Sequence, residues 1–272
     1  MDSAPRPSRG PDRRLPLVRV SSEGRRVTIT LDDPDRRNAL GRRMFGSLES
    51  ALAGIESSKE ESIPIVRLRG AGPAFCAGFD LDACGGDDGQ SVLAEFIVRL
   101  SALLRRIRNG PWVAVAEVHG AALAGGNALA AACDFIVCAD DAIFGYPVHR
   151  IGVSPAVNAP ILQSLMGFGD ARALLLSGEL IDGREAQRRG LAWRSVPGAS
   201  LESTVDDLVG RLIRKGPRAL RATREWLNEL DGSDRADRFD RSRDASLELC
   251  GGEESERMLR ELREARRGDR LT

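Results

Sequence analysis

The sequence predicts an α/β fold in which short strands alternate with helices. Short apolar runs recur along the chain, with Ile65–Leu68 and Val113–Val118 as clear examples. Each of these runs is followed by a glycine-containing turn and then by a segment with helical periodicity. Alternation of this kind is typical of a layered α/β core. Periodicity alone would equally permit a doubly wound sheet.

Length and charge narrow the class of protein. The chain has 272 residues, which allows one large domain or a core with a small appendage. Lys and Arg number 40, as do Asp and Glu, so nothing indicates a nucleic-acid or anionic-membrane partner. No stretch approaches the length of a membrane span. The five cysteines are odd in number and form no Cys-x-x-Cys pair, which favours reduced thiols in a cytoplasmic protein without a metal site.

The first elements are predicted as a tail, a hairpin and a helix. Residues 1–14 are rich in Pro, Arg and Ser and have no apolar period, so a disordered tail is expected. Leu17–Val20 and Val27–Leu31 flank a glycine and predict a hairpin. Asn38 is expected to cap a helix that begins near Ala39.

The later part of the chain is predicted to become helical. Residues 92–107 carry one apolar stripe, as an amphipathic helix does. From about Leu201 onward the pattern is helical and strongly charged. We therefore expect an α/β core over residues 15–198 and a helical region over residues 199–272.

Two glycine turns carry the most informative chemistry. They are Phe-Cys-Ala-Gly-Phe-Asp-Leu at residues 75–81 and Ala-Leu-Ala-Gly-Gly-Asn at residues 122–127. A strand, a glycine turn and a helix start leave backbone N–H groups unpaired at the positive end of the helix dipole. Two such turns side by side would aim two donors at one oxygen, which is the arrangement of an oxyanion hole.

These turns resemble the signatures of a known family. Residues 70–81, Gly-Ala-Gly-Pro-Ala-Phe-Cys-Ala-Gly-Phe-Asp-Leu, are similar to the first signature of the crotonase (enoyl-CoA hydratase/isomerase) superfamily. Residues 118–134 resemble the second, with a Gly-Gly pair and a final Cys-Asp. Asn-Ala-Leu at residues 38–40 and Leu-Ser-Gly-Glu at residues 176–179 resemble two further segments of this family, and the four motifs occur in the family's order. The resemblance implies a crotonase-like spiral of ββα repeats with a C-terminal helical trimerisation region.

The resemblance also implies a ligand and its contacts. An acyl-CoA thioester would place its oxygen between the N–H groups of Ala77 and Gly125 and be stabilised there as an enolate. Arg37, Ala39 and Phe79 are candidate contacts of the CoA moiety. No separate cofactor is expected, because CoA is part of the substrate. The family's C-terminal region implies a homotrimer or a dimer of trimers.

The family's usual carboxylates are missing. Their customary positions are occupied here by Ala128, Val148 and Ala156. Because hydration needs a positioned acid or base, a conventional hydratase is not expected. Two nearby side chains could substitute. His149 lies beside the empty second position, and histidine is a common proton-transfer group, but a lone histidine is more often structural. Tyr146 either packs or donates a hydrogen bond.

Three further residues have structural interpretations. Glu117 interrupts an apolar strand and, if buried, needs a partner such as an arginine or a neighbouring subunit. His119 is expected to be structural, and Cys76 has no evident activating base beside it.

Two functions therefore stay open. One is an enzyme on acyl-CoA thioesters with non-standard acid/base residues, catalysing isomerisation, decarboxylation or atypical hydration. The other is a non-catalytic acyl-CoA-binding or scaffold homologue. A titratable side chain facing the hole would favour the enzyme, and an apolar lining would favour the binding protein.

Overall fold

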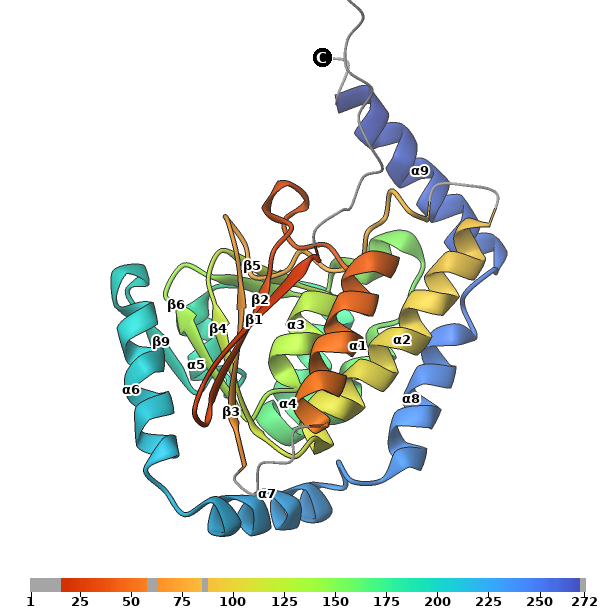
Figure 1. Ribbon diagram of the computed structural model, residues 1–272. Helices are drawn as coiled ribbons and strands as arrows, with labels where there is room; N and C mark the ends of the chain where they lie inside the picture. The colour runs from red at the N-terminus through yellow and green to blue at the C-terminus, as the bar shows by residue number, and fades with distance from the viewer. Residues whose placement is uncertain (1–15, 58–62, 85–87, 270–272) are drawn as a thin grey trace, which may run out of the picture.

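The computed structural model describes residues 16–57, 63–84 and 88–269, so the predicted tail at residues 1–14 lies outside the described residues (Figure 1). The larger of two sheets has the strand order β1-β2-β3-β4-β6-β9. β1 pairs with β2 antiparallel, and every other pair in this sheet is parallel. Its strands are β1 (Val18–Glu23), β2 (Arg26–Leu31), β3 (Ile65–Gly70), β4 (Val113–Val118), β6 (Phe135–Ala139) and β9 (Arg194–Val196).

A second, smaller sheet begins with the strand that comes directly after β4 in the chain. Its strands are β5 (Ala121–Leu123), β7 (Ile143–Gly145) and β8 (Leu180–Ile181), in the order β5-β7-β8. Within each sheet the strands follow chain order without the reversal of a doubly wound sheet, which excludes that alternative. The hairpin and the strands at 65–68 and 113–118 predicted from the sequence are confirmed.

Helices cover both faces of the larger sheet. α6 packs against β3, β4 and β6 on one face, and α1 to α4 lie on the other side (Figure 1). The helices of the core are α1 (Arg42–Glu56), α2 (Gly89–Asn109), α3 (Gly125–Ala131), α4 (Ala159–Ser177) and α5 (Gly183–Arg188). Those of the C-terminal region are α6 (Leu201–Ile213), α7 (Pro217–Asp231), α8 (Ala236–Leu247) and α9 (Glu253–Asp269).

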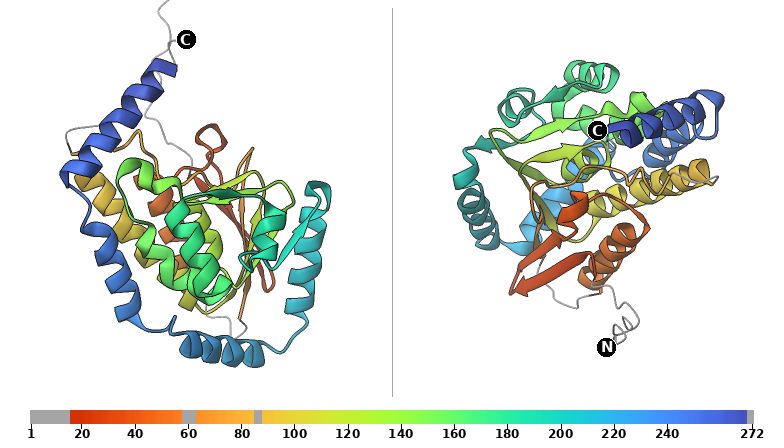
Figure 2. Two further views of the ribbon diagram at one scale, coloured as in Figure 1. Left: turned by 180° about the vertical axis from the view of Figure 1, so that it is seen from behind. Right: turned by 90° about the horizontal axis from the view of Figure 1, so that it is seen from above.

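The C-terminal helices run along the outside of the core rather than forming a separate body. α6, α7 and α8 follow its outline, and α9 extends away from it (Figure 2). Within the described ranges, four short 3₁₀ helices join the larger elements: η1 (Pro34–Arg36), η2 (Pro147–Ile151), η3 (Pro155–Asn158) and η4 (Gly198–Ser200). Among the described residues, no helix is long and apolar enough to cross a membrane.

Asn38 does not cap a helix, and this prediction is wrong. α1 begins at Arg42, with Gly41 at its N-cap. Asn38 is fully buried, and its Oδ1 accepts from the N–H of Asp33 at 2.8 Å. Its Nδ2 donates to the carbonyls of Ala71 and Ala74, each at 2.9 Å. Asn38 therefore holds the segment before the first glycine turn, a long-range role that its local sequence does not reveal.

Glu117 has the arginine partner that its burial demanded. Glu117 is 3% exposed on β4 and forms ion pairs with Arg67 and Arg69 on β3. Arg67 also contacts Asp206 on α6 at 3.2 Å. The charge that interrupts the apolar strand is thus neutralised, and it links β4 through β3 to the covering helix.

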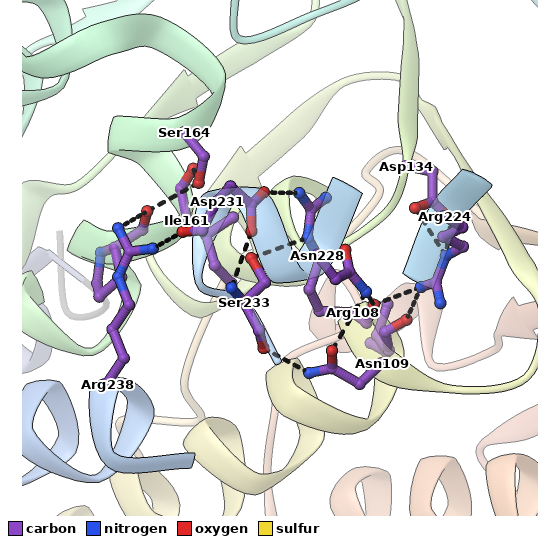
Figure 3. Close-up of polar contacts among 12 residues, drawn as sticks. Arg108, Asn109, Asp134, Ile161, Ser164, Arg224, Asn228, Asp231, Ser233 and Arg238 are labelled. Atoms are coloured by element: carbon purple, nitrogen blue, oxygen red, sulfur yellow. Dashed lines mark hydrogen bonds and ion pairs between the residues drawn. The ribbon is translucent and has the colours of Figure 1, made fainter. Parts of the chain in front are cut away.

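Arg224 on α7 anchors the C-terminal helices to the core (Figure 3). Its Nε donates to Asp134 at 2.8 Å, and its two terminal nitrogens donate to the carbonyls of Ile107, Arg108 and Gly110 at the end of α2. Asp134 in turn accepts from the N–H of Ala114 at the start of β4. One buried guanidinium therefore satisfies the last carbonyls of α2 and joins them to β4.

We expect Arg224→Met to destabilise the protein by about 3–5 kcal/mol, because it leaves Asp134 as an uncompensated charge. Arg218→Met is the matched control, since Arg218 lies on the same helix but is exposed. Urea denaturation measures both variants. Equal stability of the two would contradict the anchoring role.

Candidate active site

The two glycine turns lie side by side. Cys76 donates its N–H to the carbonyl of Ala121 and accepts from the N–H of Leu123, each at 3.0 Å. A Cβ on Gly78, where φ is +89°, would lie 2.8 Å from the Leu123 carbonyl oxygen and 3.5 Å from the Gly125 nitrogen. A Cβ on Gly126 would lie 2.2 Å from the Cys76 carbonyl oxygen. Glycine at these positions allows the backbones to approach closely.

Ala77 was predicted to donate its N–H to the thioester oxygen, but this N–H is already bonded, so the prediction is contradicted. Its N–H donates to the carbonyl of Arg37 at 3.0 Å. The free donor is Phe79. Leu40 pairs with Phe79 in a parallel bridge, which uses the Gly78 carbonyl at 2.8 Å and the Asp80 N–H at 3.1 Å. In this pairing the N–H of Phe79 points away from Leu40, and it has no acceptor among the described residues.

Gly125 supplies the donor of the second turn. It is the first residue of α3, and the first helical bond is donated later, from the Ala128 N–H to the Ala124 carbonyl. Ala124 has a φ of +49°, a rare conformation for a residue with a side chain. Its N–H donates to the Gly145 carbonyl at 2.8 Å, which holds this turn in place.

Gly125 lies against Phe79. A Cβ on Gly125 would lie 3.3 Å from the Phe79 ring and 3.0 Å from Cδ1 of Leu40. The free N–H groups of the two turns therefore belong to neighbouring residues. Such a pair can donate to one oxygen.

The first turn is braced by an ion pair. Asp80 is 8% exposed, and its carboxylate contacts Arg36 at 2.5 Å. Arg37, the candidate phosphate contact, is exposed, and Ala39 is half-buried. Their contacts with CoA stay predictions.

The three positions at which the resemblance predicts an acid carry apolar side chains. Ala128 is in the first turn of α3 and is 1% exposed. Val148 on η2 and Ala156 on η3 are half-buried. Methyl and isopropyl groups at these positions cannot transfer a proton.

Tyr146 is a neutral, hydrogen-bonded side chain. It is 2% exposed, and its hydroxyl oxygen accepts from Nδ2 of Asn158. Burial raises the pKa of Tyr146 well above its usual range, so the phenol stays protonated at neutral pH. It can donate a hydrogen bond, but it cannot act as a base there.

His149 is exposed on η2. Its Nδ1 lies 3.7 Å from where a Cβ of Gly178 would be, just beyond the end of α4. No hydrogen bond of its ring is present among the described residues, and its catalytic role stays a prediction. His119, in contrast, is structural as expected, since its Nε2 donates to the Gly72 carbonyl at 2.8 Å.

The thiols are structural. All five cysteines are free, and four of them are buried. Burial raises the pKa of Cys76 to about 12, and its Sγ donates to the Asn38 carbonyl at 3.1 Å. A thiol so held is protonated near neutral pH and is a poor nucleophile.

The chain matches known proteins over most of its length. The family model described as "Enoyl-CoA hydratase/isomerase" matches residues 24–248. A Thermus thermophilus protein named "Putative enoyl-CoA hydratase" is 34% identical over 229 residues, which is 82% of this chain and 88% of that protein. The "Probable enoyl-CoA hydratase echA6" of Mycobacterium leprae is 33% identical over 210 residues, 76% of this chain and 80% of that protein.

Solved structures share the fold. The crystal structure of an enoyl-CoA hydratase/isomerase from Xanthobacter autotrophicus Py2 aligns with a TM-score of 0.80 at 26% identity, covering 91% of this chain and 93% of that one. The site described above lies within the matched region.

Proposed function

Because the chain belongs to the enoyl-CoA hydratase/isomerase family, or crotonase superfamily, we propose that it binds an acyl-CoA thioester at the two glycine turns. The thioester oxygen would lie between the N–H groups of Phe79 and Gly125. The observation that carries this proposal is that these two N–H groups lack backbone acceptors among the described residues, while the residues lie so close that a Cβ on Gly125 would be 3.3 Å from the Phe79 ring. The family and fold predicted from the sequence are confirmed.

Two fixed donors favour charge on the thioester oxygen. An enolate carries more negative charge there than the ground-state carbonyl does, so the pair stabilises the enolate more. Each such donor contributes about 2.7–4 kcal/mol to a reaction of this kind.

The proposed chemistry is not conventional hydration. The usual acid positions are apolar, and Tyr146 is buried and neutral. We propose an enzyme with non-standard acid/base residues, with His149 as a candidate, acting by isomerisation, decarboxylation or atypical hydration. The apolar side chains of Ala128, Val148 and Ala156 equally favour a non-catalytic acyl-CoA-binding homologue.

Arg37 is the proposed phosphate contact of CoA. Its side chain is exposed, whereas the neighbouring Arg36 is held by Asp80. Ala39 directly precedes Leu40, which pairs with Phe79, so both remaining candidates lie beside the first turn. No additional cofactor is proposed.

Thioester binding tests the proposal directly. Isothermal titration of the full chain would compare butyryl-CoA with S-butyl-CoA, a thioether that lacks the carbonyl oxygen. We expect the thioester to bind about three to ten times more tightly, which corresponds to a net hydrogen-bond gain near 1 kcal/mol. Absent butyryl-CoA binding, or equal affinity for the two ligands, would contradict the proposal.

We also propose a homotrimer or a dimer of trimers. Trp226, Leu227 and Leu230 on α7 are 56%, 54% and 65% exposed, an apolar group that a subunit contact would cover. The free thiols support a reducing, cytoplasmic location. Light scattering coupled to gel filtration measures the assembly, for which a mass of three or six chains is expected. A single-chain mass at micromolar concentration would contradict it.

A further inference from the structure

The direction of the Phe79 N–H is fixed at the opposite edge of its peptide unit. The peptide that joins Gly78 to Phe79 carries the Gly78 carbonyl on that edge, and this carbonyl accepts the N–H of Leu40 at 2.8 Å. Because a trans peptide unit is planar, the hydrogen bond to Leu40 also sets the direction of the Phe79 N–H. Gly78, with a φ of +89°, would otherwise let this peptide unit rotate at little steric cost.

Leu40 follows a strained stretch of chain. Arg37 and Asn38 have φ values of 51° and 56°, in the left-handed region that is uncommon for residues with side chains. Such conformations persist only where the surrounding contacts hold them. The Arg37 carbonyl accepts the N–H of Ala77 at 3.0 Å, and Asn38 is bonded through its side chain. Contacts with the first turn therefore keep Leu40 in place.

An ion pair joins this stretch to the residue after Phe79. The carboxylate of Asp80 lies 2.5 Å from a terminal nitrogen of Arg36, and the Asp80 N–H donates to the Leu40 carbonyl at 3.1 Å. On the other side of Leu40, a Cβ on Gly41 would lie 3.0 Å from Oδ2 of Asp80. Asp80 is thus bonded to Arg36 and Leu40 and lies close to Gly41, so it spans the stretch that directs the Phe79 N–H.

The two members of this ion pair differ in exposure. The Arg36 side chain is 50% exposed, whereas the Asp80 side chain is 9% exposed. An ionised carboxylate is costly to bury alone, so Asp80 needs either its arginine or water. Because Arg36 is half exposed, water can reach the carboxylate once the guanidinium is removed, and the protein should stay folded. Asp80 would then turn outward, and Phe79, which is covalently joined to it, would move with it.

We propose that Arg36 is a positioning residue, which acts through Asp80 and Leu40 to direct the Phe79 N–H at the thioester oxygen. Arg36 does not touch the ligand in this role, unlike its neighbour Arg37, the proposed contact of a CoA phosphate. The inference rests on the proposed function, because it concerns one of the two donors that hold the thioester.

The affinity ratio of a thioester and its thioether measures the donors separately from the rest of the ligand. Butyryl-CoA and S-butyl-CoA share the CoA moiety, so any contact of an arginine with CoA cancels in the ratio. In isothermal titration of the full chain, wild type is expected to bind butyryl-CoA about three to ten times more tightly. Arg36→Met should lower this ratio to about one to two, since only the Gly125 N–H still reaches the carbonyl oxygen.

Three further variants identify the route of the effect. Asp80→Ala removes the carboxylate and should lower the ratio as Arg36→Met does. Arg36→Lys keeps a positive charge on a long side chain and should keep most of the ratio. Arg42→Met is the matched control, because the Arg42 side chain is 57% exposed and pairs with Glu95 at 2.8 Å, two residues beyond Leu40. It should keep the wild-type ratio, and circular dichroism shows whether each variant folds.

The outcomes separate this inference from the proposed function. A wild-type ratio of about one, or no binding of butyryl-CoA to wild type, would overturn the proposed function. With the expected wild-type ratio, an unchanged ratio in folded Arg36→Met would overturn the positioning role. An equal fall of the ratio in Arg42→Met, or an unchanged ratio in folded Asp80→Ala, would overturn it as well.

Discussion

Ala128→Glu/Val148→Glu is expected to hydrate crotonyl-CoA about 10²–10⁴ times faster than wild type, the usual contribution of positioned general acid–base groups. These are the two positions at which the sequence resemblance predicts the glutamates of a conventional hydratase. Ala128 lies three residues after Gly125 in the first turn of α3, so a glutamate there starts beside the proposed thioester site. Because Ala128 is 1% exposed, burial would raise the pKa of the new carboxyl, which suits a general acid.

Ala128→Gln/Val148→Gln is the matched control for this gain. Glutamine has the same size and hydrogen-bonding geometry but cannot transfer a proton. Stopped-flow absorbance at the enoyl thioester band follows the hydration. Equal rates for the Gln and Glu variants, or an inactive Glu variant that still binds crotonyl-CoA, would contradict the proposal that the missing carboxylates make conventional hydration unexpected.

Gly125→Pro should lower the kcat of that gained hydration by about 10²–10³, because it removes one donor of the oxyanion hole. Proline is tolerated at the first residue of a helix, where its N–H would have no helical partner. Here the lost N–H is the group proposed to hold the thioester oxygen. The effect should appear in kcat more than in KM, since the donor acts most strongly on the transition state.

Gly125→Ala distinguishes the effect of losing the N–H from the effect of adding a Cβ. Both substitutions place a Cβ 3.0 Å from Cδ1 of Leu40 and 3.3 Å from the Phe79 ring, but alanine keeps the N–H. We expect Gly125→Ala to retain most of the activity that Gly125→Pro loses. Circular dichroism shows whether both variants fold, and equal losses in the two would show that crowding, not the donor, causes the effect.

The sequence predicts the framework of this site well, for a physical reason. Strand, glycine turn and helix are local patterns, so β3 and β4, the two turns and the start of α3 follow from neighbouring residues. The burial of Glu117 with an arginine partner follows in the same way, because an unpaired charge inside an apolar strand is not tolerated.

What the sequence does not predict depends on distant partners. Whether Ala77 or Phe79 has the free N–H is decided by Arg37 and Leu40, which reach the first turn from another part of the chain. Asn38 has the residue type of a helix cap, but its bonds go to residues 71–75 across the fold.

The central claim is that the N–H groups of Phe79 and Gly125 hold the thioester oxygen. Difference infrared spectroscopy of butyryl-CoA with a ¹³C-labelled carbonyl measures this contact directly. We expect the carbonyl stretch to move to lower frequency on binding to wild type, to stay low in Gly125→Ala, and to return toward its value in water in Gly125→Pro. A carbonyl band that is unchanged from water in the saturated wild-type complex would contradict the claim.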